Sequence, residues 1–187
     1  MISHNRLVIH DQRGLISMLD ISDPTKMRCM WQWQAAGIRG VPLLFGNMLA
    51  CVAGQKLVVL DSETGITLWE KALSSSATGG AIFAADRLWL TSDQGIMGLS
   101  LGGHSDDVLL ECGAVRSAIV HSGDYVACVS ESNEIIIVDA FAGLIHKRIE
   151  GAIGEHAPIL SDDALLYLTE GALMRYDLST DETHLWT

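Results

Sequence analysis

The feature that most constrains this chain is an internal repeat with a period of about 39 residues. One landmark is an anchor position at the end of an apolar run, which recurs at separations of 41, 40, 38 and 38 residues at Asp20, Asp61, Leu101, Asp139 and Asp177. A second landmark is a turn residue, spaced 42, 39, 38 and 39 residues apart, at Asn5, Asn47, Asp86, Asp124 and Asp163. Two independent landmarks with one period predict a structural unit that is used five times.

The pattern inside each unit predicts short β-strands joined by tight turns. Six residues before each anchor stands a residue suited to a turn, at Gly14, Gln55, Gly95, Asn133 and Gly171. Segments rich in β-branched, aromatic and aliphatic residues precede these turns, as in "RLVIH", "MLACVA" and "RLWLT". Another such segment comes before them, as in "GGAIFAA", and one follows the anchor, as in "ITLWEKAL". No segment has sustained helical periodicity, so each unit is expected to contain four strands.

A four-stranded unit of this length predicts an all-β fold of the β-propeller type. A small twisted sheet cannot bury both of its faces alone, so neighbouring sheets must stack around an axis. We expect a single propeller domain over residues 1–187, with about five repeats near 1–34, 35–73, 74–113, 114–151 and 152–187. The first repeat begins at its Asn5 landmark and is expected to lack its inner strand. The resulting open edge predicts a protein partner or a homo-oligomer.

Charge and hydropathy argue against two kinds of partner. The formal net charge is −11 and the pI is about 4.9, so nucleic acid would be repelled. No uncharged apolar run reaches the roughly 18 residues of a membrane span, and the N-terminus lacks a basic start followed by an apolar stretch. We therefore expect a cytoplasmic protein without membrane insertion. The four cysteines are scattered, and we expect reduced, mostly buried thiols at Cys29, Cys51, Cys112 and Cys128.

The segment "LDSETGITLW" resembles the repeat of the quinoprotein-like β-propellers, the pyrroloquinoline-quinone-type family that includes BamB-type propellers. The family motif is an apolar residue, an Asp, a Thr-Gly turn and a docking Trp, and it is matched by Leu60, Asp61, Thr64, Gly65 and Trp69. The fourth repeat keeps the Asp in "VDAFAG" but has Lys147 at the Trp position. The fifth keeps Asp177 and ends with Trp186, whereas the third has lost the Asp.

The resemblance implies structural roles for the motif residues. The docking rings are expected to pack between adjacent sheets, at Trp31, Trp69 and Trp186. The anchor carboxylates are expected to accept N–H bonds from the turn that follows them, at Asp61, Asp139 and Asp177. Quinoprotein dehydrogenases of this family bind their quinone through a pair of adjacent cysteines, a Trp platform and calcium-bound carboxylates. No two cysteines are adjacent here, so we expect no cofactor and no enzymatic activity.

Other chemical motifs are weak. The seven histidines fall in different repeats, and none has the spacing of metal ligands. Gly79 and Gly80 lack the Lys-Ser/Thr pair and the helix that follow a phosphate-binding loop, and they are expected to begin an inner strand where units crowd together. We therefore predict no metal site and no catalytic residue.

The connections at one end of each unit are the predicted binding surface, because a rigid scaffold holds such loops while their sequences vary. They are the turns between the second and third strands and the loops between repeats. Their mixed charges suit a partner protein better than an apolar ligand. The residues predicted to bind the partner are Arg13, Arg39, Asp93, Arg116, Glu131, His156 and Glu170. The sequence therefore predicts a non-enzymatic protein-interaction scaffold.

Two alternatives stay open. One is a propeller that binds a small ligand or a sugar, or a diverged hydrolase, with a site in the central channel near His121 and His156. The other is one part of a larger quinoprotein-like protein.

Overall fold

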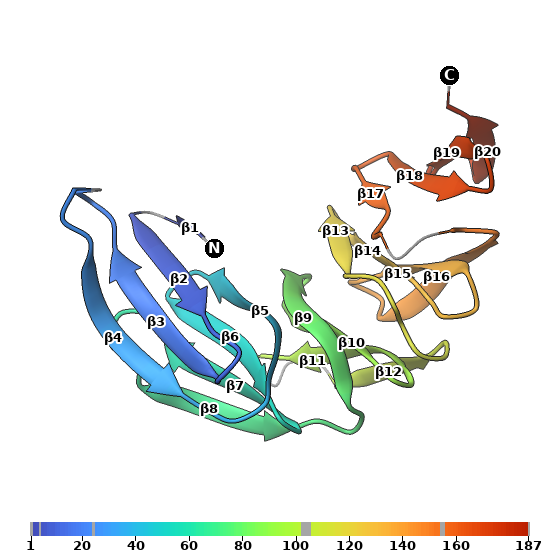
Figure 1. The fold of residues 1–187 in the computed structure, drawn as a ribbon. Helices are drawn as coiled ribbons and strands as arrows, with labels where there is room; N and C mark the ends of the chain where they lie inside the picture. Colours follow the sequence, from blue (N-terminus) through green and yellow to red (C-terminus); the bar gives the residue numbers. More distant parts are fainter. Residues whose placement is uncertain (1, 4, 24, 102–105, 154–155, 187) are drawn as a thin grey trace. The chain divides into compact units, whose positions relative to one another are not determined.

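The computed structural model describes residues 2–3, 5–23, 25–101, 106–153 and 156–186. These residues form twenty β-strands and no helix, arranged as five four-stranded antiparallel sheets (Figure 1). Within each sheet the strands pair in the order in which they follow one another along the chain. We number the sheets 1 to 5 from the N-terminus, and each lies within one predicted repeat. The expected all-β chain with four strands in each of repeats 2 to 5 is confirmed.

The strands are short throughout. Sheet 1 contains β1 (Ile2–Ser3), β2 (Arg6–His10), β3 (Leu15–Asp20) and β4 (Arg28–Gln34). Sheet 2 contains β5 (Ile38–Phe45), β6 (Met48–Ala53), β7 (Lys56–Asp61) and β8 (Thr67–Ala72). Sheet 3 contains β9 (Ala77–Ala84), β10 (Arg87–Ser92), β11 (Gly95–Ser100) and β12 (Val108–Glu111). Sheet 4 contains β13 (Val120–Ser122), β14 (Tyr125–Val129), β15 (Glu134–Asp139) and β16 (Leu144–Glu150). Sheet 5 contains β17 (Ile159–Leu160), β18 (Ala164–Thr169), β19 (Ala172–Asp177) and β20 (Glu182–Leu185).

The first sheet corrects the expectation that repeat 1 lacks its inner strand. Strand β1 is present and pairs with β2, with Ile2 opposite Leu7 and Ser3 opposite Arg6. Two residues are too few to produce the alternating pattern by which a strand is recognised in a sequence. The absence of an inner strand in repeat 1 is therefore a wrong prediction.

The third repeat also shifts by one position. The last residue of the third strand is Asp20, Asp61, Asp139 or Asp177 in the other sheets, and in sheet 3 it is Ser100 rather than the predicted Leu101. A serine has no carboxylate to organise the next turn. Instead, the backbone N–H of Ser100 donates to Asp107 Oδ1 at 3.1 Å.

The contacts within the chain divide it into two compact units, Met1–Ala81 and Ile82–Thr187. The first unit contains sheets 1 and 2, the second contains sheets 4 and 5 with most of sheet 3, and the boundary falls within β9. We describe each unit by itself. The single domain remains a prediction.

In the first unit, sheets 1 and 2 bury one face of each sheet against the other. We call the face of a sheet that meets the next sheet its forward face, and the face that meets the preceding sheet its rear face. The buried cluster joins the forward face of sheet 1, through Val8, Ile16 and Met18, to the rear face of sheet 2, through Leu49, Cys51, Val58 and Leu60. At about 25 cal/mol per Å² of buried apolar surface, such contacts are the main stabilising contribution that a small sheet can gain.

The second unit repeats this arrangement twice. The forward face of sheet 3, with Trp89 and Ile96, packs against the rear face of sheet 4, with Val126, Cys128, Ile136 and Val138. The forward face of sheet 4 then packs against the rear face of sheet 5, through Ala127, Val129, Ile135 and Ile137 on one side and Leu165, Tyr167 and Tyr176 on the other. Alternate residues of β14 and β15 therefore serve two different interfaces.

The first strands of sheets 2 and 3 approach each other through glycine backbone, as predicted for Gly79 and Gly80. Both glycines lie in β9, and a Cβ added to Gly40 in β5 would stand 2.2 Å from the backbone nitrogen of Gly80. Only glycine fits this contact. The small residues that open these strands are therefore required by packing and form no phosphate-binding loop.

The anchor carboxylates fill the role that the sequence predicts. Asp61 Oδ1 accepts N–H bonds from Glu63 at 3.0 Å and Thr64 at 2.8 Å. Equivalent bonds reach Asp139 from Ala142 at 2.8 Å and Asp177 from Ser179 at 2.9 Å. The hydroxyl and the N–H of Thr64 are the main causes that hold the pKa of Asp61 below its usual value.

Trp31 confirms the predicted docking role between sheets. It lies in β4 opposite Met18, and its indole Nε1 donates to the carbonyl of Ser62 in the next sheet at 3.0 Å. Its ring lies directly over Gly65 of the same turn. Trp69 occupies the equivalent register position in sheet 2, opposite Val59. In sheet 5 this position, opposite Arg175, is taken by His184, so the match of Trp186 to the docking position is wrong.

Replacing Gly65 with alanine should destabilise the first unit through the ring of Trp31. The new Cβ would stand 2.7 Å from Trp31 Cδ2, whereas a Cβ at Gly46 would meet nothing within 4 Å, and both glycines have a left-handed φ, of +72° and +53°. Gly46→Ala should therefore cost about 1–2 kcal/mol for its backbone alone. Gly65→Ala should cost about 1–3 kcal/mol more, as overpacking does. Urea unfolding of both variants measures the difference, and equal losses would contradict the docking contact.

The cysteines are free thiols, as the sequence predicts. Cys51, Cys112 and Cys128 are buried, and Cys29 is exposed. Burial raises the pKa of Cys51 to about 12 and also raises the pKa values of Cys112 and Cys128. Thiolate is the reactive form of cysteine, so the three buried thiols should be inert in the folded protein.

A maleimide should therefore modify one cysteine in the native protein and four in denaturant. Intact-mass spectrometry counts the added groups, and peptide mapping should place the native modification at Cys29. Rapid native labelling of Cys51 or Cys128 would show that the sheets separate far more readily than their buried contacts suggest.

Candidate functional site

The connections at one end of the sheets are tied to the sheets by a recurring backbone bond. In each case the N–H of a residue just after the fourth strand donates to a carbonyl in the turn between the second and third strands. The pairs are Ala35 to Gly14 at 3.1 Å, Leu73 to Gln55 at 2.9 Å, Cys112 to Gln94 at 3.2 Å and Ala152 to Asn133 at 3.0 Å. These turns and connections, which we call the turn surface, are therefore held in fixed positions.

In the first unit, the turn surface carries the predicted residues Arg13 and Arg39. Arg13 is exposed in the turn after β2, where its N–H donates to Asp11 Oδ1 at 2.9 Å. Arg39 lies in β5 and not in a loop, and its guanidinium donates to the carbonyl of Ala77 at 3.2 Å. Both arginines are exposed, and Arg39 is in addition bonded to the backbone of β9.

In the second unit, three predicted acidic residues stand at equivalent turns of successive sheets. Asp93 lies between β10 and β11, Glu131 between β14 and β15, and Glu170 between β18 and β19, and all three are exposed. The turn that carries Glu131 is further fixed because its N–H donates to the carbonyl of Ala114 at 2.8 Å. The structure therefore places these carboxylates on one end of the unit.

Arg116 resembles Arg39 in its contacts. It is half-buried, and its Nη2 donates to the carbonyl of Ala152, in the connection to the next sheet, at 3.4 Å. Its Nε is buried and has no hydrogen-bond partner among the described residues. Much of its positive charge is consequently withdrawn from the surface, and the turn surface of the second unit is left predominantly acidic.

Sequence reasoning missed a second pair of arginines that connect sheets. Arg6 donates to Ser62 Oγ at 3.0 Å and to Glu63 Oε1 at 2.9 Å, in the turn of sheet 2. Arg87 donates to the carbonyls of Ala140 and Phe141 at 3.0 and 3.1 Å, in the equivalent turn of sheet 4. Each arginine begins the second strand of its sheet, directly after a landmark residue with positive φ. This shared position, directly after a landmark residue, is the sequence signal by which the two arginines could have been found.

Arg87→Met should lower the free energy of unfolding by about 2–3 kcal/mol, because it removes two hydrogen bonds from a charged donor and leaves two carbonyls without it. Methionine keeps the apolar part of the side chain, so packing is largely conserved. Arg13→Met removes the same charge from an exposed turn and serves as the control, with an expected change under about 0.5 kcal/mol. Denaturant unfolding compares the two, and similar losses would rule out a structural role for the Arg87 guanidinium.

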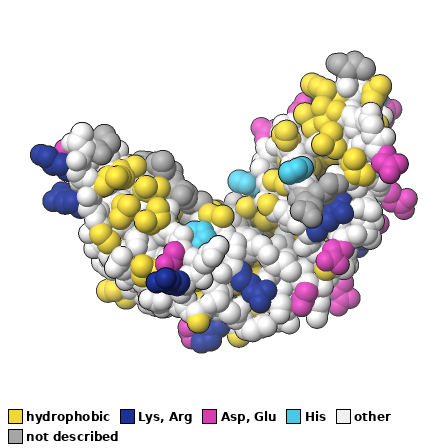
Figure 2. Space-filling model, viewed as in Figure 1, with side chains coloured by type: hydrophobic (Ala, Val, Ile, Leu, Met, Phe, Trp, Pro, Cys, Tyr) yellow, Lys and Arg dark blue, Asp and Glu magenta, His cyan; other side chains and the backbone are white. Residues whose placement is uncertain are grey.

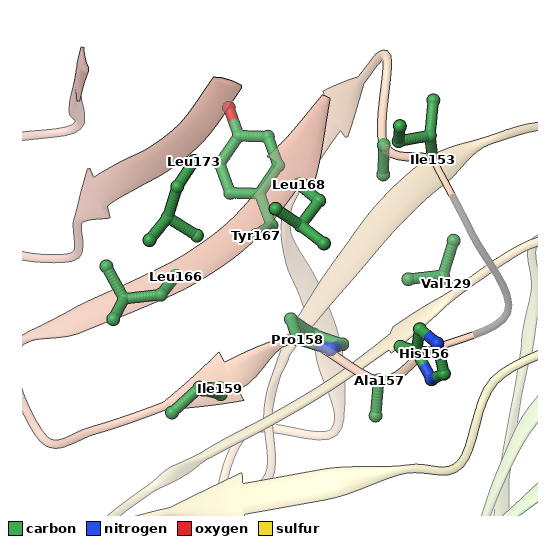
Figure 3. Close-up of a pocket in the computed structure, with 11 residues that line it drawn as sticks. Val129, Ile153, His156, Ala157, Pro158, Ile159, Leu166, Tyr167, Leu168 and Leu173 are labelled. Atoms are coloured by element: carbon green, nitrogen blue, oxygen red, sulfur yellow. The ribbon is translucent and has the colours of Figure 1, made fainter. Parts of the chain in front are cut away.

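His156 lines an apolar cavity of about 260 Å³ in the second unit (Figure 3). Leu166, Leu168 and Leu173 of sheet 5 form one side, with Pro158 and Ile159 beside them. His156 and the Tyr167 hydroxyl are the side-chain polar groups in this lining. His121, the other histidine of the predicted channel, is exposed and does not line the cavity. The structure therefore does not bring the two histidines to one pocket.

The described residues offer little for metal chemistry or membrane insertion. Among them, no group of three or more His, Cys, Asp and Glu side chains is placed to hold a metal ion. The same residues include no helix long and apolar enough to cross a membrane.

Comparison with known proteins identifies the fold. No protein-family model matches the chain, and no curated protein sequence matches it. The crystal structure of BamB from Moraxella catarrhalis resembles it with a TM-score of 0.75 and 18% identity, over 96% of this chain and 60% of that one. The computationally designed Ika8 protein resembles it with a TM-score of 0.78 and 16% identity, over 95% of this chain and 57% of that one.

These likenesses show a fold similar to the BamB β-propeller, with five repeats. At such low identities they show the fold alone. The chain spans about three fifths of the length of each of these two proteins.

Proposed function

We propose that this protein is a non-enzymatic interaction scaffold whose turn surface binds a partner protein with a basic patch. The observation that carries the proposal is the row of exposed carboxylates, Asp93, Glu131 and Glu170, on equivalent turns of sheets 3, 4 and 5. The turns that carry Asp93 and Glu131 are fixed by backbone bonds, so binding there would order little additional chain. The BamB-like fold supports a scaffold in general terms.

The chemistry of the partner follows from the charges exposed at this end of the second unit. Arg116 is directed into the fold, and His156 lies at the mouth of the apolar cavity. The acidic groups therefore dominate this end of the second unit, and the net charge of −11 adds a long-range field of the same sign. Complementary charge would guide a basic protein toward the surface and fix its orientation. Nucleic acid would be repelled by the same field.

A second candidate is a small-ligand site in the cavity beside His156. The cavity is apolar, and its volume of about 260 Å³ is slightly below the usual range for ligand pockets. A sugar needs several hydrogen-bonding partners, and the lining offers His156 and Tyr167. The cavity therefore suits a small apolar group better than a sugar.

The main proposal is tested by reversing charge on the turn surface. The triple variant Asp93→Lys, Glu131→Lys and Glu170→Lys changes the net charge by about six units and should lose the partner. The control variant Asp106→Lys, Asp124→Lys and Glu182→Lys makes the same change at exposed sites away from these turns. Each protein is cross-linked in extract from its host cells, and the bound proteins are quantified by mass spectrometry.

The expected result is a basic protein that is enriched by the unmodified chain and by the control variant, and reduced at least about tenfold with the turn-surface variant. Equal recovery with all three baits would refute the role of the turn surface. Equal loss with both variants would show that total charge, and not this surface, attracts the partner.

A further inference from the structure

The contact between sheets 4 and 5 has an ion pair where sheets 1 and 2 use an aromatic ring. In the first unit, the ring of Trp31 lies over Gly65, in the turn after the anchor of the next sheet. In sheet 4 the same register position holds Lys147, opposite Ile137. The Nζ atom of Lys147 contacts both carboxylate oxygens of Asp181 in sheet 5, Oδ1 at 2.7 Å and Oδ2 at 2.8 Å. Opposite charges therefore join sheet 4 to sheet 5.

Asp181 occupies a backbone position that is glycine in the equivalent turns. Its N–H donates to the carbonyl of the anchor Asp177 at 3.0 Å, as the N–H groups of Gly65 and Gly143 do to their own anchors at 2.8 and 2.9 Å. All three residues have a left-handed φ, of +61°, +72° and +70° respectively. A side chain disfavours this conformation, and it is kept where surrounding contacts compensate for the strain. The contacts of the Asp181 carboxylate supply that compensation.

Tyr176 is the third member of this group. Its hydroxyl donates to Asp181 Oδ1, and its ring is 1% exposed within the buried cluster between the two sheets. The Lys147 ammonium lies 5.9 Å from the centroid of the same ring, which holds the cation in place. Both oxygens of the carboxylate thus accept hydrogen bonds, and a proton can bind to either oxygen only by displacing a donor. We call Lys147, Asp181 and Tyr176 the charged contact.

The groups that face Asp181 determine the direction in which pH acts on this contact. The hydrogen bonds from Lys147 and Tyr176 are the main causes that hold the pKa of Asp181 below its usual value. A carboxyl group of this kind adds stability above its usual pKa of about 3.9, and that stability is lost as the pH falls through the lowered value. The titratable and charged groups around Asp181 are Tyr125, His146 and Lys147 of sheet 4 and Tyr176, Asp177 and Glu182 of sheet 5.

We propose that the charged contact is an acid-sensitive device, which holds sheet 5 against sheet 4 near neutral pH and makes their separation more frequent when Asp181 is protonated. Sheet 5 carries Glu170, so its separation would also interrupt the row of carboxylates on the turn surface. None of the three side chains of the charged contact belongs to the turn surface. The device is therefore independent of the proposed partner.

Hydrogen exchange of the purified chain, followed by mass spectrometry, measures how often sheet 5 separates. Amides of β19 should exchange when the rear face of sheet 5 is uncovered, because a sheet of this size loses its order alone. Protection is expressed relative to unstructured peptide at the same pH. Between about pH 7 and about pH 2, protection of β19 should fall at least about threefold more than that of β7, whose sheet is held by Trp31. Equal falls in both strands would overturn the proposal.

A neutral variant separates Asp181 from the other carboxylates. Acidic side chains are spread over the surface of the second unit in the view of Figure 2, and several of them can titrate in acid. Asp181→Asn keeps the shape of the side chain and tolerates a left-handed φ. It should lower the protection of β19 about threefold at about pH 7 and should lose less further protection in acid than the unmodified chain. Asp163→Asn is the matched control and should leave β19 unchanged, because Asp163 pairs with Arg175 within sheet 5, at 3.3 Å.

A double variant replaces the charged contact with the neutral one of the first unit. Lys147→Trp with Asp181→Gly should restore at about pH 7 the protection that Asp181→Gly alone loses, and it should resist acid better than the unmodified chain. Circular dichroism confirms that each variant is folded. Unchanged protection of β19 in Asp181→Asn at neutral pH, or the same acid loss in the double variant as in the unmodified chain, would overturn the proposal.

Discussion

Each sheet of this protein is too small to cover its own apolar residues, and the rest of the structure depends on that shortage. The middle strands of sheet 4 alternate between two interfaces, so that Val126 and Cys128 pack against sheet 3 while Ala127 and Val129 pack against sheet 5. An antiparallel sheet with one solvent-exposed face would have polar residues at every second position of each strand. The nearly continuous apolar runs in the second and third strands are therefore the consequence of being packed on both sides.

Polar groups set the position of one sheet on the next. Burial alone is not directional, but the indole of Trp31 and the guanidinium groups of Arg6 and Arg87 each reach the turn after the anchor in the following sheet. The anchor carboxylate holds that turn in shape through its own N–H bonds, as Asp61 and Asp139 do. Side chain, turn and carboxylate therefore act together, and this explains why the landmark residues recur with the period of the repeat.

The sequence allowed the repeat, the strands and the anchor bonds to be predicted, because each depends on residues close together in the chain. Prediction from the sequence failed where the signal was too short or where the feature depended on contacts between sheets. Strand β1 has two residues and no detectable pattern. The bonds of Arg39 and Arg116 to the carbonyls of Ala77 and Ala152 were not predicted, because these carbonyls are far away in the sequence. The cavity beside His156 likewise depends on how β17, β18 and the preceding connection pack, which no spacing in the sequence reveals.

The three acidic residues predicted to bind the partner are exposed, whereas two of the predicted arginines bond to backbone carbonyls. Asp93, Glu131 and Glu170 lie at turns, where the type of residue and the position in the repeat are enough to predict exposure. A long basic side chain can instead turn back along the fold, and its direction depends on the acceptors within its reach.

The alternation of forward and rear faces also bears on how a chain of this kind can change in length. Every contact between sheets described above joins immediate neighbours, so a duplication or loss of one whole repeat would leave the contacts between the remaining sheets intact. A deletion of half a repeat would leave an apolar face without a matching neighbour. Insertions and deletions of whole repeats should therefore be tolerated, because each repeat has a face that matches the repeat before it and a face that matches the repeat after it.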